Sequence, residues 1–242
     1  MKRKKTSESL TLVEHLTELR KRIIYSGLSL IVFSIIGYNF AGYIAKDIIS
    51  RAPDMDFVFI SPSELMLAYI RIAVFCGLVI SAPIILNQIW IFISPGLEKK
   101  QRKYVFIALL LGGGFFVVGA IFAYIIVLPF IFKFFAGFQM PEIKATISFA
   151  SYLSFIISIL IAFGVVFELP IIMFLLTRFG IFKVEFFTKY RKYMVLIILI
   201  VAAILTPPDV VSQVLLAIPM LLLYEIGILL SKIGQKRLYR KD

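Results

Sequence analysis

The sequence predicts an all-α integral membrane protein with six transmembrane helices and both termini in the cytoplasm. Of its 242 residues, 61% are hydrophobic, and the mean hydropathy of +0.98 implies more apolar surface than a soluble domain of this length can bury. Seven, four, five and five of the 26 Lys and Arg residues fall in the segments 2–22, 99–103, 178–192 and 232–241. Because short loops rich in Lys and Arg stay cytoplasmic, these clusters place both termini inside.

The net charge and the single cysteine limit the class of protein further. A charge of +12 does not indicate a nucleic-acid-binding protein, because such a protein gathers its basic residues on one folded surface. Here the basic residues mark the inner face of the membrane, where anionic lipid also favours them. Cys76 is the only cysteine, so no intramolecular disulfide is possible. We expect one transmembrane domain over 1–242, with a cytoplasmic amphipathic tail (1–22), a six-span bundle (23–230) and a basic cytoplasmic tail (231–242).

The first four spans have ordinary lengths, since about 20 apolar residues cross the roughly 30 Å of hydrocarbon in a bilayer. They are expected at about 23–44, 64–89, 104–130 and 151–177, with outer segments over 45–63 and 131–150 and an inner loop over 90–103. The first stretch follows 22 polar residues and ends without a small-x-small cleavage site, so it is expected to be a retained span.

The last two spans are predicted to be short. The segments 194–205 and 214–224 hold 12 and 11 uninterrupted apolar residues, and 12 residues make about 18 Å of helix. Between them, Pro207 and Pro208 end one helix, and Asp209 can cap the next. Two explanations stay open: ordinary short helices that use their flanking polar residues, or a hydrophobic mismatch that thins the bilayer.

The amino-terminal tail is predicted to form an amphipathic helix that lies at the inner surface and runs into the first span. Its apolar residues recur at helical spacing: Leu12, Leu16, Leu19 and Ile23. Thr11 and Glu14 match a capping box, and Glu14, Glu18 and Arg22 follow one another at four-residue steps on one face. His15 is interpreted as a surface residue, since the chain has no second histidine with which to build a site.

Polar residues inside the spans are candidate functional residues, because each costs roughly 3 kcal/mol at the middle of the membrane. Glu168 lies about 13 Å from the inner end of its span, and Pro170 bends the helix beside it. Glu168 is either a buried acid that ties helices together or part of a functional polar pocket. Arg71 lies nearer the outer end and can extend its side chain outward. Gln213 and Glu225 are candidates for hydrogen bonds between helices.

Prolines and glycines predict the shape of the bundle. Pro83 and Pro170 stand in the similar sequences Ser-Ala-Pro-Ile-Ile and Glu-Leu-Pro-Ile-Ile, each in the inner half of a helix that runs inward. Two bent helices of the same sense suit a concave bundle, although the match is too short to define a repeat. The glycines at 112–114 and Gly119 are expected to permit close helix packing.

The sequence gives no sign of an enzyme. It lacks a His-Glu-x-x-His zinc helix, a Gly-x-Ser-x-Gly elbow and a phosphate-binding glycine-rich loop, and no two aspartates lie within the spans. Neither a metal site nor a cofactor is therefore expected. Two classes remain: a small ion-coupled transporter with Glu168 as its ionisable site, and a receptor or scaffold for another polypeptide.

Six segments together carry a recognisable pattern. They are 14–22 (EHLTELRKR), 81–97 (SAPIILNQIWIFISPGL), 150–155 (ASYLSF), 163–170 (FGVVFELP), 205–220 (LTPPDVVSQVLLAIPM) and 223–227 (LYEIG). They cover nearly the whole chain in the right order, and the LTPPD segment is highly specific. In these segments the sequence resembles the TatC family, the multispanning core of the twin-arginine protein translocase.

The resemblance implies a glove-shaped bundle in the cytoplasmic (inner) membrane that acts as a receptor for signal peptides with paired arginines on folded cargo. It also implies single-span partners of the TatA and TatB type, self-association in a larger complex, and transport driven by the proton-motive force. In the family, the signal-peptide site combines the amino-terminal tail with the first inner loop. Glu18 matches the tail glutamate, and Phe92 and Pro95 match the aromatic residue and the proline of the loop.

One position departs from the family pattern, because the family's loop glutamate aligns with Gln101. Glu98 would share a helical face with position 101 if the loop continues the third helix, and we predict that it supplies the missing charge. The alternative is that Glu98 only balances the lysines of the loop. Glu168 aligns with the family's buried glutamate on the concave face, and Thr206 and Gln213 match a polar cluster that resembles a docking place for a partner helix. An ion-coupled transporter is the less favoured function, since no clear inverted repeat is present.

Overall fold

The structure is a computed structural model of the full chain and describes residues 12–52, 56–137, 146–205 and 210–239. In chain order, its elements are α1 (Leu12–Tyr38), α2 (Ala41–Ser50), β1 (Asp56–Val58), α3 (Pro62–Ile93), the 3₁₀ turn η1 (Ser94–Gly96), α4 (Lys99–Phe122), the π-helical segment η2 (Ala123–Val127), α5 (Leu128–Ala136), β2 (Thr146–Ser148), α6 (Phe149–Phe167), α7 (Leu169–Arg178), α8 (Val184–Lys189), α9 (Arg191–Leu205) and α10 (Val210–Tyr239).

The long helices make the chain a multispan membrane protein. Within the described residues, four helical stretches are long and apolar enough to cross a membrane: Pro62–Gly96, Gln101–Ala136, Phe149–Arg178 and Gln213–Gln235. α1 and α2 reach this standard only as a pair, which bends by 66° and brings the number to five. α9 has 15 residues, about 22 Å of helix, so the sixth crossing stays a prediction.

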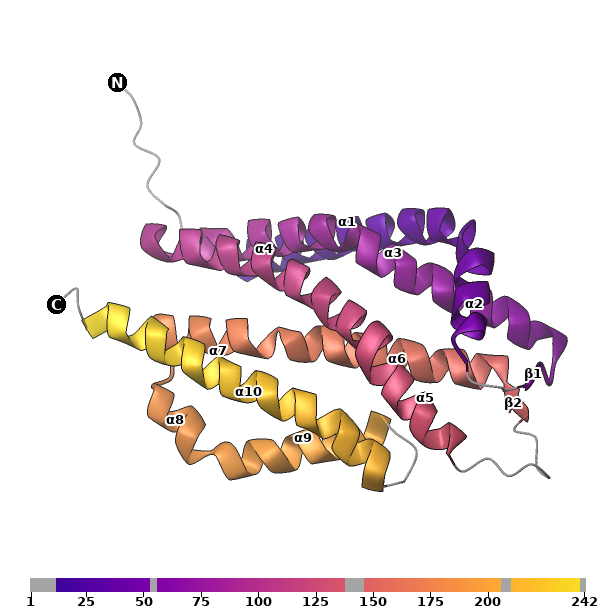
Figure 1. Cartoon of the computed structure of the whole chain (residues 1–242). Coiled ribbons are helices and arrows are strands. Elements are labelled where there is room, and N and C mark those ends of the chain that lie inside the picture. The colour runs from indigo at the N-terminus through magenta and orange to yellow at the C-terminus, as the bar shows by residue number, and fades with distance from the viewer. Residues whose placement is uncertain (1–11, 53–55, 138–145, 206–209, 240–242) are drawn as a thin grey trace.

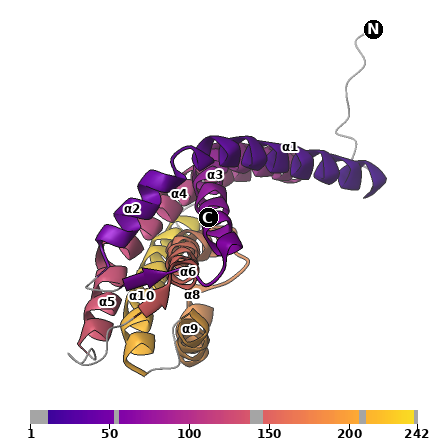
Figure 2. The ribbon, with the colours of Figure 1, turned by 90° about the vertical axis from the view of Figure 1, so that its right-hand side faces the viewer.

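The helices form an open, bent array. α1 packs chiefly on α3, whereas α9 packs on α10 at the other edge of the molecule. Seen end-on, the array runs from α1 through α3 and α4 to α6, α10 and α9 (Figure 2). The first turn of α1 and the last turn of α10 lie at one end, which we call the terminal end, and β1 and β2 lie at the opposite end, the strand end (Figure 1).

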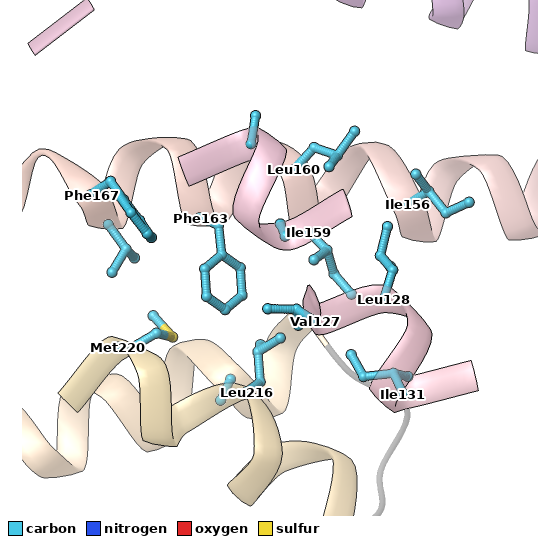
Figure 3. Packing of buried hydrophobic residues seen from close by; sticks show 14 of the residues in the cluster. Val127, Leu128, Ile131, Ile156, Ile159, Leu160, Phe163, Phe167, Leu216 and Met220 are labelled. Atoms are coloured by element: carbon cyan, nitrogen blue, oxygen red, sulfur yellow. The ribbon is translucent and has the colours of Figure 1, made fainter. Parts of the chain in front are cut away.

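Helix α6 forms the centre of the core. Ile156, Ile159 and Phe163 of α6 are almost fully buried. They lie close to Leu128 of α5 and Leu216 of α10 (Figure 3). A helix that is apolar on every side suits a position surrounded by other helices. Because lipid tails are as apolar as leucine, close packing rather than the hydrophobic effect holds such helices together in a membrane.

Glycines let α4 approach α6 closely, as the sequence predicted. A Cβ atom on Gly119 would lie 2.6 Å from the carbonyl oxygen of Phe163, and one on Gly164 would lie 2.5 Å from the ring of Phe116. Gly114 differs, because a Cβ atom there would meet no atom within 4 Å. The small-residue contact between α4 and α6 therefore depends on Gly119 and Gly164 and not on Gly114.

The two prolines expected to bend helices behave differently. α6 ends at Phe167 and α7 begins at Leu169, so the helix breaks two residues before Pro170. The break follows because Pro170 has no N–H to donate to the carbonyl four residues earlier. Pro83, by contrast, lies inside α3, which continues to Ile93.

The prediction that both of the last helices are short is wrong for the second. α9 is short, but α10 has 30 residues. Glu225 does not end α10, because the residues that follow it are apolar again and Ile228 is buried in the core. The carboxylate of Glu225 instead pairs with Arg191 of α9, at 2.9 Å between Oε2 and Nη2.

A short parallel sheet closes the strand end, which the sequence reading did not anticipate. Asp56 pairs with Thr146 and Val58 with Ser148, so the two outer segments are joined. Glu64 strengthens this link, since it accepts hydrogen bonds from the backbone N–H of Ile60 (2.7 Å) and from the hydroxyl of Ser148.

Candidate functional site

Helix α1 positions the tail glutamate at the terminal end. The predicted continuity of the tail with the first span is confirmed, since α1 is unbroken from Leu12 to Tyr38. Oε1 of Glu18 lies 3.0 Å from Nη2 of Arg22, one turn further along the helix. Nη1 of Arg22 donates to Oε1 of Gln88 in α3 at 3.2 Å. These three residues, which we call the tail cluster, link α1 to α3.

The tail cluster is partly exposed. The side chains of Glu18 and Arg22 are 23% and 22% exposed, so water and a peptide can reach the ion pair. Nε of Arg22 is buried and has no hydrogen-bond partner within the described residues. A hollow of about 340 Å³ lies on the same face of α1, lined by Val13, Glu14, Thr17, Glu18, Lys21 and Arg22.

A stacked ring pair holds the start of α1 against the end of α3. The rings of His15 and Phe92 lie 4.5 Å apart between centroids, with an angle of 23° between their planes. His15 is exposed, as predicted, but it contacts a residue that the family resemblance assigns to the site. The stack lies one turn from the tail cluster along both helices, because His15 precedes Glu18 by three residues and Phe92 follows Gln88 by four.

The inner loop is shaped by η1 and by the cap of α4. Pro95 is the second residue of η1 and is exposed. Glu98 has an extended backbone (φ −63°, ψ 151°) and is the N-cap of α4. Its backbone N–H donates to Oε1 of Gln101 at 3.2 Å, which is half of a capping box.

This geometry corrects the expected relation of Glu98 to Gln101. α4 begins at Lys99, so Glu98 does not continue that helix and does not share a helical face with Gln101. Gln101 serves as the third residue of the capping box, a position that glutamate and glutamine fill equally well. Glu98 is exposed, and no ion pair among the described residues involves its carboxylate.

Glu168 lies between α6 and α7 and faces α4. A Cβ atom on Gly112 of α4 would lie 2.6 Å from Oε2 of Glu168, so the missing side chain of Gly112 makes room for the carboxylate. Glu168 is half-buried, and within the described part of the chain its carboxylate has neither a hydrogen bond nor an ion pair. A carboxylate in this setting is available to a group from outside the chain.

Gln213 joins the last two helices. Its Nε2 donates to the carbonyl oxygen of Leu199 in α9 at 3.0 Å, as expected for a hydrogen bond between helices. Four further candidates lie outside the described residues: Thr206, Pro207, Pro208 and Asp209. Of the predicted docking cluster, Thr206 and Gln213, the structure therefore describes only Gln213.

The tail cluster has members that sequence reasoning did not select. The spacing of Arg22 from Glu18 predicted that the two lie on one helical face. The hydrogen bond from Arg22 to Gln88 could not be predicted in this way, because the two residues are 66 positions apart in the sequence. His15 and Gln88 carried no signal of their own beyond lying in the family segments. Among the described residues, no group of three or more His, Cys, Asp or Glu side chains could hold a metal ion.

The fold and the site define a multispan helical membrane protein with a charged, ring-lined surface at the terminal end. Residues 14–219 match the family model of TatC, the Sec-independent protein translocase protein. The chain therefore belongs to the TatC family, whose members are transport proteins rather than enzymes.

The sequences of individual relatives are similar to this chain over almost its whole length. The TatC protein of Aquifex aeolicus is 39% identical over 94% of this chain and 97% of its own. That of Desulforapulum autotrophicum is 37% identical over 95% of this chain and 87% of its own. The crystal structure of the twin-arginine translocase receptor TatC superposes with a TM-score of 0.80 at 37% identity, covering 91% of this chain and 99% of that one.

Proposed function

We propose that this chain is the receptor subunit of a twin-arginine translocase, which binds signal peptides with paired arginines on folded cargo. It lies in the cytoplasmic membrane with six crossings, α9 among them, and with both termini in the cytoplasm. The tail cluster supports this proposal most directly, because it holds a partly exposed glutamate where the basic segments mark the cytoplasmic side.

In the proposed mechanism, one signal arginine replaces Arg22 on Glu18. A partly exposed ion pair contributes only about 0–1 kcal/mol, so the exchange costs little. Arg22 makes one contact with the carboxylate, at 3.0 Å, whereas a free arginine can bind both oxygens at once. The rings of His15 and Phe92 then offer an apolar surface beside the bound guanidinium.

Glu98 supplies the second carboxylate of the proposed site. It is exposed at the start of α4, where Gln101 fixes the backbone rather than contributing charge. Pro95 and η1 set the direction of the loop between Phe92 and Glu98. The neighbouring basic residues of the loop reduce the gain from this second contact, so Glu98 contributes less than Glu18.

Partner proteins of the TatA and TatB type complete the proposed translocase, which assembles into a larger complex and uses the proton-motive force. Glu168 is the intramembrane group proposed to contact a signal-peptide or partner helix, and Gln213 and Thr206 are proposed to dock a partner's transmembrane helix. Membership of the TatC family favours this function over an ion-coupled transporter.

Peptide binding to the detergent-purified full chain tests the proposal. A twin-arginine peptide is compared with a twin-lysine peptide, for the natural chain and for Glu18→Gln, Glu98→Gln and Glu185→Gln. Glu185 is an exposed acid of α8 and serves as the control. Loss of one charge-assisted contact of about 1.5–3 kcal/mol should weaken binding to Glu18→Gln by roughly 10- to 150-fold. Equal binding of all four proteins would reject the site.

A further inference from the structure

Arg71 lies within a stretch long and apolar enough to cross a membrane, and among the described residues no acidic side chain pairs with it. It follows the first residue of α3 by nine positions, about 13 Å along the helix from the strand end. The ion pairs among the described residues are Glu18–Arg22, Asp47–Arg51 and Arg191–Glu225. A cation inside a membrane without an acidic partner is expected to serve a ligand or a pathway.

The contacts of Arg71 do not neutralise it. Its Nη1 donates to the hydroxyl of Ser154 in α6, and that hydroxyl donates in turn to the carbonyl oxygen of Ala150 at 2.6 Å. The chain of hydrogen bonds therefore ends in the helix backbone rather than in an anion. The remaining N–H groups of the guanidinium keep their capacity to donate.

An apolar groove begins at Arg71 and runs toward the middle of the membrane. It has a volume of about 460 Å³ and is lined from α3 and α6 by Ile70, Arg71, Val74, Phe75, Leu78, Ser154, Ile157, Ser158 and Ile161. The lining positions extend over eight residue steps of α3 and seven of α6, about 12 Å and 10 Å of helix. α2, α4 and α5 lie on the other side of the α3–α6 pair (Figure 2), and none of their residues lines the groove.

A positive charge at the outer mouth of an apolar groove matches the chemistry of one phospholipid. We propose that this groove binds a phospholipid of the outer leaflet, with its phosphate on the guanidinium of Arg71 and one acyl chain between α3 and α6. Apart from Arg71 and the two serines Ser154 and Ser158, the lining of the groove is apolar, which suits an acyl chain below a charged headgroup.

Arg51 provides a matched control for the charge. It lies at the same strand end and is exposed, but its Nε is already paired with Oδ2 of Asp47 at 3.1 Å. Its guanidinium also lies over the ring of Tyr124, 4.8 Å from the centroid. Replacing Arg51 removes a surface charge without touching the groove, so its effect measures general electrostatic attraction alone.

Lipid retention by the full chain tests the proposal. The protein is reconstituted with phosphatidylglycerol or with diacylglycerol of the same acyl chains, extracted, and examined by native mass spectrometry. The natural chain is expected to retain one phosphatidylglycerol and no diacylglycerol. Retention should fall at least about fivefold in Arg71→Gln and stay close to natural in Arg71→Lys and Arg51→Gln. Val74→Phe, which fills the groove but keeps the charge, should also lose the lipid.

Several outcomes would overturn the proposal. They are unchanged retention in Arg71→Gln or Val74→Phe, an equal loss in Arg51→Gln, and retention of diacylglycerol. Recovery of an acidic single-span protein that Arg71→Gln fails to bind, with lipid retention unchanged, would show that the groove serves a partner instead. Each variant is first shown to elute as a single species with an unchanged melting temperature, so that loss of lipid is not loss of fold.

Discussion

The contact between α4 and α6 predicts opposite effects for alanine at two glycines of one helix. In Gly119→Ala the new Cβ atom would lie 2.6 Å from the carbonyl oxygen of Phe163 and 2.8 Å from the ring of Phe167. An ordinary contact needs at least 3.4 Å, so the helices must separate by about 0.8 Å. Overpacking of this kind costs about 1–3 kcal/mol, which corresponds to a melting temperature lower by roughly 2–12 °C.

The control is Gly114→Ala, five residues earlier on α4, where a new Cβ atom meets nothing within 4 Å. Alanine favours a helix over glycine by up to about 1 kcal/mol, so this variant should melt at the natural temperature or slightly above it. Thermal melting of the full chain in detergent, followed by the amount that still elutes as a single species, measures both. Equal losses in the two variants, or no loss in Gly119→Ala, would refute the packing argument.

Three further predictions concern the site residues. Arg22→Gln removes the internal competitor for Glu18 and should tighten twin-arginine peptide binding by no more than about fivefold; a tenfold weakening would mean that Arg22 instead positions Glu18. Gln213→Leu loses its bond to Leu199 and should destabilise the chain by about 0.6 kcal/mol in a melting experiment, and no change would show that this bond contributes nothing. Gly112→Ala displaces only the flexible end of Glu168, so this variant should melt at the natural temperature. It should nevertheless reduce crosslinking to partner helices, as Glu168→Ala should. Full crosslinking in either variant would count against a role for Glu168.

The sequence predicted the class and much of the helical layout, because membrane helices need long apolar runs and basic residues mark the inner loops. Its error on α10 has a physical reason. An isolated acid such as Glu225 need not end a helix when a cation such as Arg191 on the neighbouring helix pairs with it. A run of apolar residues that continues beyond such an acid indicates that the helix continues as well.

The candidate site was predicted in part. Spacing on α1 placed Glu18 and Arg22 on one face, since residues four apart in a helix are neighbours. Their contact with Gln88, and the stack of His15 on Phe92, depend on how α1 packs against α3, which no local pattern contains. The role of Glu98 could not be predicted either. Whether it extends α4 or caps it depends on its own backbone conformation, which is extended in the structure.

The most direct test of the receptor role places a photoreactive amino acid at position 17 of the full chain in its membrane, because Thr17 lines the same hollow as Glu18 and its replacement leaves the carboxylate of Glu18 in place. A bound signal peptide is then mapped for the residue that it crosslinks. We predict crosslinks at the paired arginines, competed by unlabelled twin-arginine peptide and absent with twin-lysine peptide. Crosslinks confined to the hydrophobic part of the peptide, or equal yields with both peptides, would contradict the assignment of Glu18.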